Sequence, residues 1–382
     1  MKNLNKILSY ILVAALASVA TLGVQFYNRG AEVSKLDQLE SLILERFIGE
    51  ADQTEMEDSA AYAMIDSLGD RWSYYIPAAS YQAHVEQMEN AYVGVGITIM
   101  AREDGTGFDV MKVDAGGPAE EAGMVAGDVI VAAEGERMEG KTTDDLRSLV
   151  RGKAGTEVRI TVLRDGREIE LTMTRREIQT PVATAQMLAH RIGLVTIYNF
   201  DSRCADETIA SIEELLQEGA TSLIFDVRNN GGGYKDELVK VLDYLLPEGP
   251  LFRSEDYKGN VTVDESDADC LEIPMAVLVN GESYSAAEFF AAALSEYEAA
   301  VVVGEKTSGK GYFQTTILLN DGSAVGLSVG KYTTPNGVSL ADVGITPDIQ
   351  VDVDEETFLE IYSGTLAPEE DPQIQAAVDA LS

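Results

Sequence analysis

Two side chains of this sequence could serve together as a nucleophile and its base, Ser285 and Lys310. Ser285 is expected to open a helix after a buried strand. A serine there most often caps the helix, but the positive end of the helix dipole also favours a nucleophile. Lys310 follows the next buried strand and lies between two glycines. Because desolvation disfavours the ammonium form, burial can lower the pKa of a lysine from about 10.4 toward neutrality and make it a general base.

A histidine base is not expected in this chain. The only two histidines, His84 and His190, both precede Ser285, whereas a serine triad on an α/β sheet needs a histidine after the serine. Residues 281–285 read G-E-S-Y-S and so also lack the last glycine of a G-x-S-x-G turn. A lysine remains as the base, and Gln314, four residues after Lys310, is expected to hold the amine in place.

Two further glycine-rich turns follow buried strands. Residues 226–233 read D-V-R-N-N-G-G-G, and such glycines let backbone N–H groups converge on an anion or a developing oxyanion. A tight strand-to-helix turn would need the same glycines. Residues 304–311 read G-E-K-T-S-G-K-G and nearly spell a phosphate-binding loop, but Gly311 replaces the hydroxyl ligand for magnesium, and a strand-like segment follows. A nucleotide-binding protein is therefore a minor alternative.

The elements around these turns predict an α/β core, a mostly parallel sheet with covering helices. From about residue 190, apolar strands alternate with helices, which is the pattern of such a sheet. Before it, short β runs separated by glycines predict a small β-rich module, and an N-terminal segment reads as helical. The expected segments are a signal anchor or signal peptide at 1–30, a helical region at 31–90, the β-rich module at 91–177, the α/β core at 178–365 and a loosely held acidic tail at 366–382.

The motifs of the core resemble those of the C-terminal processing peptidases, also called tail-specific proteases. The resemblance rests on N-G-x-S-x-S-A-x-E at 280–288, on G-K-G at 309–311 with Gln314, and on D-x-R-N-N-x-G-G at 226–233. The sequence departs from the family pattern at Tyr284 and Ala287, which replace an alanine and a serine. Tyr284 is expected to narrow the pocket beside the nucleophile.

The resemblance implies a role for each matching residue. Ser285 would be the nucleophile, Lys310, 25 residues later, the general base, and Gln314 the residue that positions the lysine. The backbone N–H groups of Ala286 and Gly232 would form the oxyanion hole.

The β-rich module resembles the PDZ domain that this family carries before its protease core. Residues 92–97, Y-V-G-V-G-I, resemble the loop whose N–H groups capture the C-terminal carboxylate of a peptide, which then adds as a strand to the sheet edge. The same glycines would suit a loop before a purely structural strand. The predicted peptide-binding residues are Val93, Gly94, Val95, Gly96 and Ile97.

Composition and the N-terminus narrow the partners and the compartment. The 382 residues carry 65 Asp and Glu against 28 Lys and Arg, a formal charge of −37, which argues against binding to nucleic acid or anionic lipid. Cys204 and Cys270 are too few for a disulfide framework, and their pairing stays open. Residues 7–26 form an apolar run after two lysines, long enough to span a bilayer. We therefore expect an uncleaved anchor with the rest outside the cytoplasm, or secretion after signal cleavage.

Together these observations predict an extracytoplasmic serine endopeptidase that cleaves proteins near their C-termini through a Ser285–Lys310 dyad. Its PDZ domain would bind the apolar C-terminus of a protein or peptide substrate, and its N-terminal helix would tether it to the membrane. No metal, cofactor or nucleic acid is expected, and a homodimer is left open. The alternative is a catalytically inactive PDZ scaffold that binds protein C-termini.

Overall fold

The computed structural model describes residues 34–382, so the expected anchor at 1–30 lies outside the described residues. The chain divides into two compact units, the first ending at Tyr75 and the second running from Ile76 to Ser382. The first unit contains α2 (Lys35–Arg46) and α3 (Gln53–Asp66), and β1 (Tyr74–Ile76) leads out of it. Ser34 begins α2 with a capping box. From residue 34 onward, no helix is long and apolar enough to cross a membrane.

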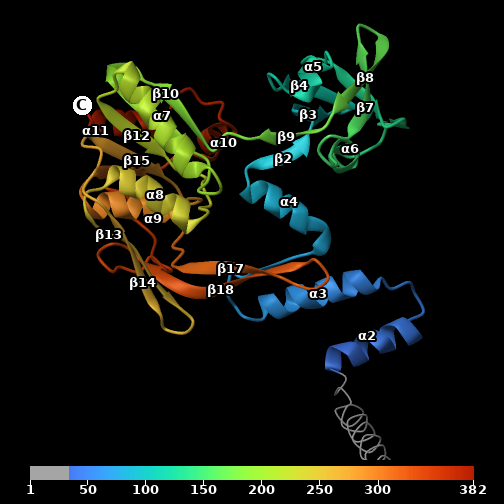
Figure 1. Ribbon diagram of the computed structural model, residues 1–382, viewed down its shortest axis with the longest axis horizontal. Helices are drawn as coiled ribbons and strands as arrows, with labels where there is room; N and C mark the ends of the chain where they lie inside the picture. The colour runs from blue at the N-terminus through green and yellow to red at the C-terminus, as the bar shows by residue number, and fades with distance from the viewer. Residues whose placement is uncertain (1–33) are drawn as a thin grey trace, which may run out of the picture. The chain divides into compact units, whose positions relative to one another are not determined.

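A β-rich module forms the N-terminal part of the second unit (Figure 1). Its main sheet has the strand order β3-β4-β5-β7-β8, with β6 on β5, while β2 and β9 form a separate antiparallel pair. Asp165 and Gly166 both have positive φ between β7 and β8, which confirms the expected hairpin. The elements are α4 (Ala78–Met88), β2 (Ala91–Gly94), β3 (Ile97–Ala101), β4 (Phe108–Val113), α5 (Pro118–Glu121), β5 (Val129–Ala133), β6 (Glu136–Arg137), α6 (Thr143–Val150), β7 (Glu157–Arg164), β8 (Arg167–Thr174) and β9 (Arg176–Gln179).

The α/β core that follows is built on a sheet of order β10-β11-β12-β15-β16-β19. Strands β11, β12, β15, β16 and β19 run parallel and β10 is antiparallel to β11, so the expected mostly parallel sheet is confirmed. The elements are β10 (Ala183–Met187), the 3₁₀ turn η1 (Ala189–Arg191), β11 (Ile192–Ile197), α7 (Cys204–Glu218), β12 (Ser222–Asp226), α8 (Lys235–Leu245), β15 (Met275–Val279), α9 (Ala286–Glu296), β16 (Ala300–Gly304), β19 (Ile349–Gln350), α10 (Glu355–Ser363) and α11 (Pro372–Ala380).

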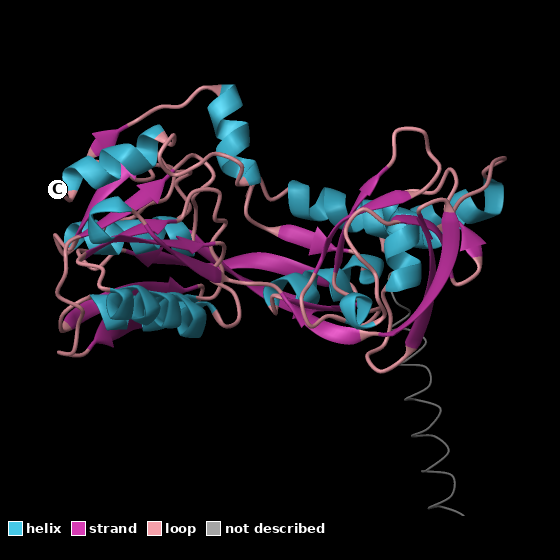
Figure 2. Cartoon of the chain, turned by 90° about the horizontal axis from the view of Figure 1, so that it is seen from above, coloured by secondary structure: helices cyan, strands magenta, loops and turns pink. Residues whose placement is uncertain are grey.

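Helices cover both faces of this sheet (Figure 2). Phe225 and Val277 point into a core shared with α7, α8 and α9, whereas Ile224 and Leu278 point into a second core shared with α11. The central strands are buried on both faces, which explains their continuous apolar sequences.

An antiparallel sheet packs beside the core. Its strands pair in the order β14-β13-β18-β17, where β13 is Gly249–Asp256, β14 is Val261–Ser266, β17 is Tyr312–Leu318 and β18 is Ala324–Thr333. Phe252 and Tyr332 from this sheet meet Phe289 of α9, with ring centres 4.7 to 5.7 Å apart. These aromatic contacts fasten the antiparallel sheet to the helix that begins after Ser285.

The expectation of a loosely held tail at 366–382 is wrong. Asp371 caps α11 through its side chain, and Ile374 and Ala377 are buried against the sheet. Asp371 also forms a buried ion pair with Arg228, at 2.8 Å, in the loop after β12. The prediction failed because it used the acidic composition of the segment and overlooked the apolar face of the short helix α11. This face covers the second core.

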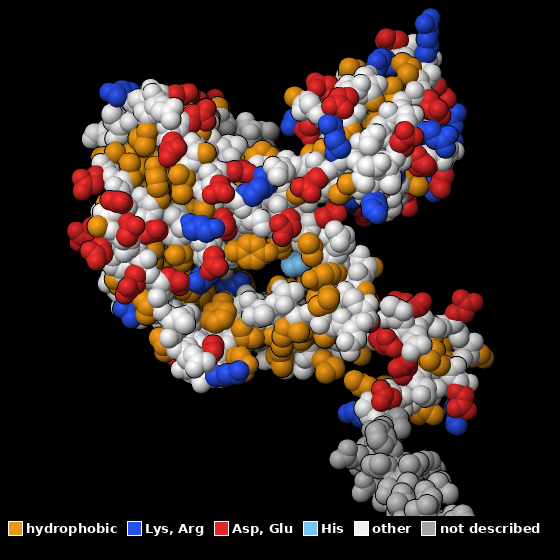
Figure 3. Space-filling view, viewed as in Figure 1, with side chains coloured by type: hydrophobic (Ala, Val, Ile, Leu, Met, Phe, Trp, Pro, Cys, Tyr) orange, Lys and Arg blue, Asp and Glu red, His pale blue; other side chains and the backbone are white. Residues whose placement is uncertain are grey.

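The second unit has charged side chains of both signs on its surface and two free thiols. Asp and Glu are spread over its visible surface, with Lys and Arg between them (Figure 3). Cys204 and Cys270 are both free thiols. Burial raises the pKa of Cys204 to about 12, so this thiol stays protonated.

Candidate active site

Three loops leave the same edge of the core sheet. They follow β12, β15 and β16, which are neighbours and run parallel, so their carboxyl ends meet. Residues 227–233, 280–285 and 305–310 are called the three-loop edge below. The predicted placement of the three glycine-bearing turns is thereby confirmed. His190 precedes β11 and so lies at the opposite edge, and His84 lies on α4.

Ser285 stands just before α9 in a strained backbone conformation. Its φ is 58° and its ψ is −124°, a combination that costs a residue other than glycine on the order of 1–3 kcal/mol. Although it occupies the N-cap position, its side chain makes no capping hydrogen bond. Helix capping therefore does not account for this serine, and strain of this kind concentrates at functional sites.

Gly232 lies directly against Ser285. A β-carbon at Gly232 would be 2.6 Å from Ser285 Cβ, 3.0 Å from Ser285 Oγ and 2.8 Å from the nitrogen of Ala286. Only glycine fits there, and its φ of 91° also favours glycine. As the first residue of α9, Ala286 has an N–H without an acceptor in the helix. The fold thus brings both predicted oxyanion donors to Ser285.

The N–H of Gly232 already has a partner in this structure. It donates to Asn230 Oδ1 at 2.8 Å, and the side-chain amide of buried Asn230 donates to the carbonyl of Ile197 at 2.7 Å. Asn230 therefore ties the glycine turn to the end of β11. An oxyanion at Ser285 would have to displace Asn230 to receive this N–H.

A buried carboxylate on α9 holds the backbone of the Lys310 loop. Glu288 accepts the N–H of Gly309 at 2.8 Å, the N–H of Lys310 at 2.9 Å and the hydroxyl of Thr307. Burial raises the pKa of Glu288, and the three donors oppose that rise. Since Ser285 is the N-cap residue of the same helix, Glu288 couples the serine to the lysine loop. It also occupies N–H groups that a phosphate would need, which argues against a nucleotide site.

Tyr332, on β18, touches both members of the predicted dyad. Its hydroxyl donates to the carbonyl of Lys310 and lies within hydrogen-bonding reach of the Ser285 side chain. The side chain is buried between phenylalanines of the core. Burial, and then the charge of Glu288, raise the pKa of Tyr332, so its hydroxyl stays protonated and remains a donor.

The amine of Lys310 lies over the ring of Tyr284, 5.8 Å from its centre, in the range of a cation–π contact. Gln314, on β17, donates its amide nitrogen to Ser328 Oγ at 2.9 Å and to the carbonyl of Tyr312 at 3.2 Å. Its carbonyl oxygen is the atom that would accept from the amine. The positioning of Lys310 by Gln314 stays a prediction.

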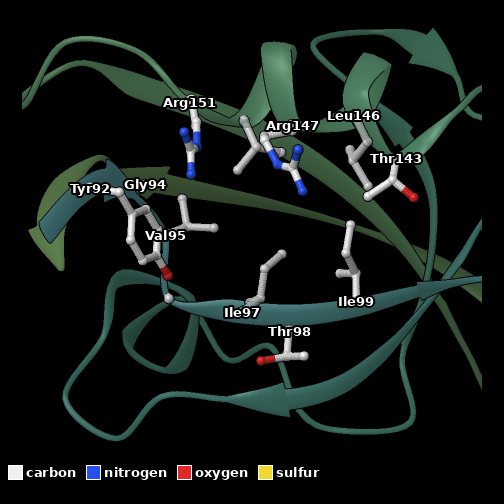
Figure 4. A pocket seen from close by; sticks show the side chains of 12 residues that line it. Tyr92, Gly94, Val95, Ile97, Thr98, Ile99, Thr143, Leu146, Arg147 and Arg151 are labelled. Atoms are coloured by element: carbon white, nitrogen blue, oxygen red, sulfur yellow. The ribbon is translucent and has the colours of Figure 1, made fainter. Parts of the chain in front are cut away.

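The β-rich module has a groove between β3 and α6 that encloses about 280 Å³. Ile97 and Ile99 form its strand side, and Leu146 and Arg147 reach over it from the helix (Figure 4). Strand β3 is at the end of its sheet, so its outer edge is open to an added strand. Of the five predicted peptide-binding residues, four line the groove, whereas Val93 pairs with Glu177 in the β2–β9 ribbon; the four are Gly94, Val95, Gly96 and Ile97.

Comparison with known families decides the assignment. Residues 191–351 match the family model of peptidase family S41, and residues 110–164 match that of the PDZ domain. The chain is an S41-type serine peptidase with a PDZ domain.

This S41 peptidase is similar to two staphylococcal proteins and to one solved structure. A probable CtpA-like serine protease of Staphylococcus aureus (strain N315) is 29% identical over 339 residues, 88% of this chain and 68% of the relative. The protein of the same description in Staphylococcus haemolyticus (strain JCSC1435) is 28% identical over 351 residues, 89% and 70% of the two chains. The crystal structure of a putative S41 protease from Bacteroides fragilis NCTC 9343 superposes with a TM-score of 0.51 at 17% identity, over 90% of this chain and 96% of that one, and shows the same fold.

Sequence reasoning missed several residues around the S41 site and the PDZ groove. Tyr332 comes from a different sheet, 22 residues beyond Lys310, and no pattern marks it. Asn230 and Glu288 were visible in the motifs, but their hydrogen bonds to the two loops were not. In the PDZ groove, Arg147 and Arg151 gave no signal, because their surface positions on a short amphipathic helix are ordinary.

Proposed function

We propose that this S41 peptidase is an extracytoplasmic endopeptidase that cleaves proteins near their C-termini through a Ser285–Lys310 dyad. The observation that carries the proposal is the strained Ser285, which lies against Gly232 and is linked to the Lys310 loop through Glu288 and Tyr332.

The proposed reaction is acyl transfer through a serine ester. Neutral Lys310 takes the proton of the Ser285 hydroxyl as its oxygen attacks the scissile carbonyl, and the resulting ammonium then protonates the leaving amine. Water, deprotonated by the same lysine, next attacks the ester and releases the acid and the free serine. Gln314 would orient the amine, and the hydroxyl of Tyr332 would fix the lysine backbone beside the serine.

The oxyanion would rest on the N–H groups of Ala286 and Gly232. For Gly232, this requires that its N–H be transferred from Asn230 Oδ1 to the substrate oxygen. An anion is a stronger acceptor than a neutral amide, so the developing charge itself favours the exchange. The Asn230 hydrogen bond then serves to hold the donor in place until charge develops.

The PDZ groove would hold the C-terminus of the substrate, with the N–H groups of residues 94–97 around its carboxylate and an edge-strand pairing along β3. Such binding would direct cleavage to peptide bonds near the C-terminus. The extracytoplasmic location and the membrane tether rest on the apolar run at residues 7–26.

The test is cleavage of an unfolded protein with an apolar C-terminus by the full-length chain, with fragments identified by mass spectrometry. Ser285→Ala and Lys310→Met should each lower the rate by ~10³-fold or more, because each removes a reacting group. Lys306→Met is the matched control, since it removes an exposed amine from the same loop and should leave the rate unchanged.

Undiminished cleavage by Ser285→Ala would overturn the dyad. Binding of the same C-terminus by wild type without any cleavage would instead favour the inactive PDZ scaffold. An amidated substrate should be cleaved more slowly than the free acid if the carboxylate is what the groove holds.

A further inference from the structure

Two arginines overhang the PDZ groove of a chain whose formal charge is −37. Thr143, Arg147 and Arg151 line the same side of the cavity, and their spacing of four residues places them in a row along α6 and its C-terminal end (Figure 4). Beneath them, Val95, Ile97 and Ile99 form an apolar floor. The groove therefore combines an apolar floor with a cationic rim.

Arg151 marks the end of the groove where a carboxylate would bind. Its guanidinium lies 5.4 Å from the ring centre of Tyr92 and pairs with Glu86 at 2.7 Å. Tyr92 and Gly94 lie at this end in Figure 4, beside the loop of residues 94–97 whose N–H groups are the predicted carboxylate donors. The C-terminus of a bound strand would thus lie next to Arg151.

Helix and strand geometry then sets which substrate residue faces Arg147. Arg151 directly follows the last residue of α6, so the four positions back to Arg147 advance ~6 Å along the helix axis, and two residues of an extended peptide advance ~6.6 Å. Alternate side chains of a strand point to the same face. The last side chain of the peptide therefore points into the apolar part of the groove, and the third from the end points toward Arg147, which lies above Ile97 in Figure 4.

We propose that Arg147 selects substrates with an acidic side chain third from the C-terminus. This inference rests on the proposed function, because it takes the PDZ groove as the site that holds the substrate's C-terminus. The Arg147 side chain is 53% exposed, and its ion-pair partner among residues 34–382 is Asp144 on the same helix surface, itself 83% exposed. Exposed pairs of this kind contribute little to stability, so an incoming carboxylate can replace Asp144.

Three acidic groups near the groove have cationic partners. The pairs are Glu86 with Arg151, Asp114 with Lys112, and Asp144 with Arg147. Only the last involves a cation that faces the middle of the groove. A glutamate or aspartate at the third position would therefore gain a charge-assisted hydrogen bond that a glutamine would not.

The experiment measures binding of fluorescent decapeptides to the full-length chain in a Ser285→Ala background, which prevents turnover. Three peptides share an apolar last residue: one has Glu third from the end, one has Gln there, and one is the Glu peptide with an amidated C-terminus. We expect the Glu peptide to bind roughly threefold to tenfold more tightly than the Gln peptide, with the preference falling as salt rises. Arg147→Gln should abolish the preference for the Glu peptide over the Gln peptide.

Arg137→Gln is the matched control, because Arg137 is an exposed arginine of the same domain that pairs with Glu168 outside the groove. It should retain the preference. Equal binding of Glu and Gln peptides by the parent, or a preference that survives Arg147→Gln, would overturn the inference. Equal binding of the free and amidated peptides would instead overturn the role of the groove in the proposed function, so the two failures are distinguishable.

Discussion

The three-loop edge and the PDZ groove differ in how strongly their polar side chains are buried and held. At the edge, Glu288 and Tyr332 are buried, and both are hydrogen-bonded to the backbone of the Lys310 loop. In the groove, Arg147 is about half exposed, and its partner is an exposed carboxylate on the same helix. The edge is thus fixed by internal bonds, whereas the groove keeps a cation whose partner can be exchanged.

This difference determines which substitutions each site can tolerate. Removing one partner from a buried polar network leaves the other unsatisfied, and the loss is large. Replacing an exposed ion pair changes free energy by less than about 1 kcal/mol. Changes at the edge should therefore alter the rate of reaction severely, while changes in the groove should grade substrate preference.

The largest effect is expected for Gly232→Ala at the three-loop edge. The new methyl group would fall 2.6 Å from Ser285 Cβ, and alanine is strained at a φ of 91°. Both effects would displace a proposed oxyanion donor, so we expect kcat to fall by ~10³-fold or more, with little change in the affinity of the PDZ domain for a peptide. Steady-state kinetics and peptide binding on the same sample measure the two effects separately.

Gly259→Ala is the control for backbone strain alone. Gly259 has a similar φ, 81°, in the turn after β13, but nothing lies within 4 Å of its added methyl group. It should lower stability without slowing catalysis. An active Gly232→Ala enzyme would show that the edge is less rigid than the comparison requires.

A smaller loss is expected for Tyr332→Phe, which removes only the hydroxyl that bonds the Lys310 carbonyl and reaches Ser285. We expect kcat to fall ~10- to 100-fold with KM nearly constant, because Tyr332 would position the proposed base Lys310 without contacting the substrate. Tyr297→Phe is matched, since its hydroxyl donates to the carbonyl of Pro250 at 3.0 Å in the same core. Equal losses in both variants would mean that the effect is one of stability rather than positioning.

The mostly parallel sheet of the core could be predicted from the sequence, because continuous apolar strands that alternate with helices are compatible with few folds. Parallel neighbours then brought Gly232, Ser285 and Lys310 to one edge. What could not be predicted is how these loops are held. The bonds from Glu288 to the lysine loop depend on the tertiary position of α9, and Tyr332 arrives from a separate antiparallel sheet.

Helix α11 and the PDZ groove show two other limits of sequence reasoning. The acidic residues around α11 suggested a solvated tail. In the structure, Asp371 caps the helix and pairs with Arg228, and the apolar residues of α11 face the sheet. In the groove, the glycine spacing predicted a carboxylate-binding loop at residues 94–97. That Arg147 lies across the groove from this loop depends on the placement of α6 beside β3, which the sequence does not give.

The smallest expected effects are changes in stability with pH, which come from one buried carboxylate in each domain. In the PDZ domain, burial would raise the pKa of Asp128, but hydrogen bonds from Arg164 and from the N–H of Val125 outweigh it and lower the pKa. In the S41 domain, burial and then the charge of Glu89 raise the pKa of Asp201 to about 7. Among the described residues, Asp201 Oδ1 has no hydrogen-bond partner.

The two carboxylates should therefore make opposite contributions to stability. Between pH 4 and 7 the folded state holds a proton on Asp201 that the unfolded chain has lost, so the free energy of unfolding falls as pH rises and levels off above 7. Asp201→Asn should remove this decline, and the melting temperature of the variant should rise relative to that of the wild type as pH increases from 4.5 to 7.5.

Asp128 is ionised in both the folded and the unfolded state between pH 4.5 and 7.5. Asp128→Asn should therefore lower stability by an amount that hardly varies with pH, because Arg164 loses its partner. Calorimetry at four pH values separates the two patterns. A pH-independent effect of Asp201→Asn would mean that this carboxylate is ionised in the folded protein and that the S41 domain, like the PDZ domain, satisfies its buried charges.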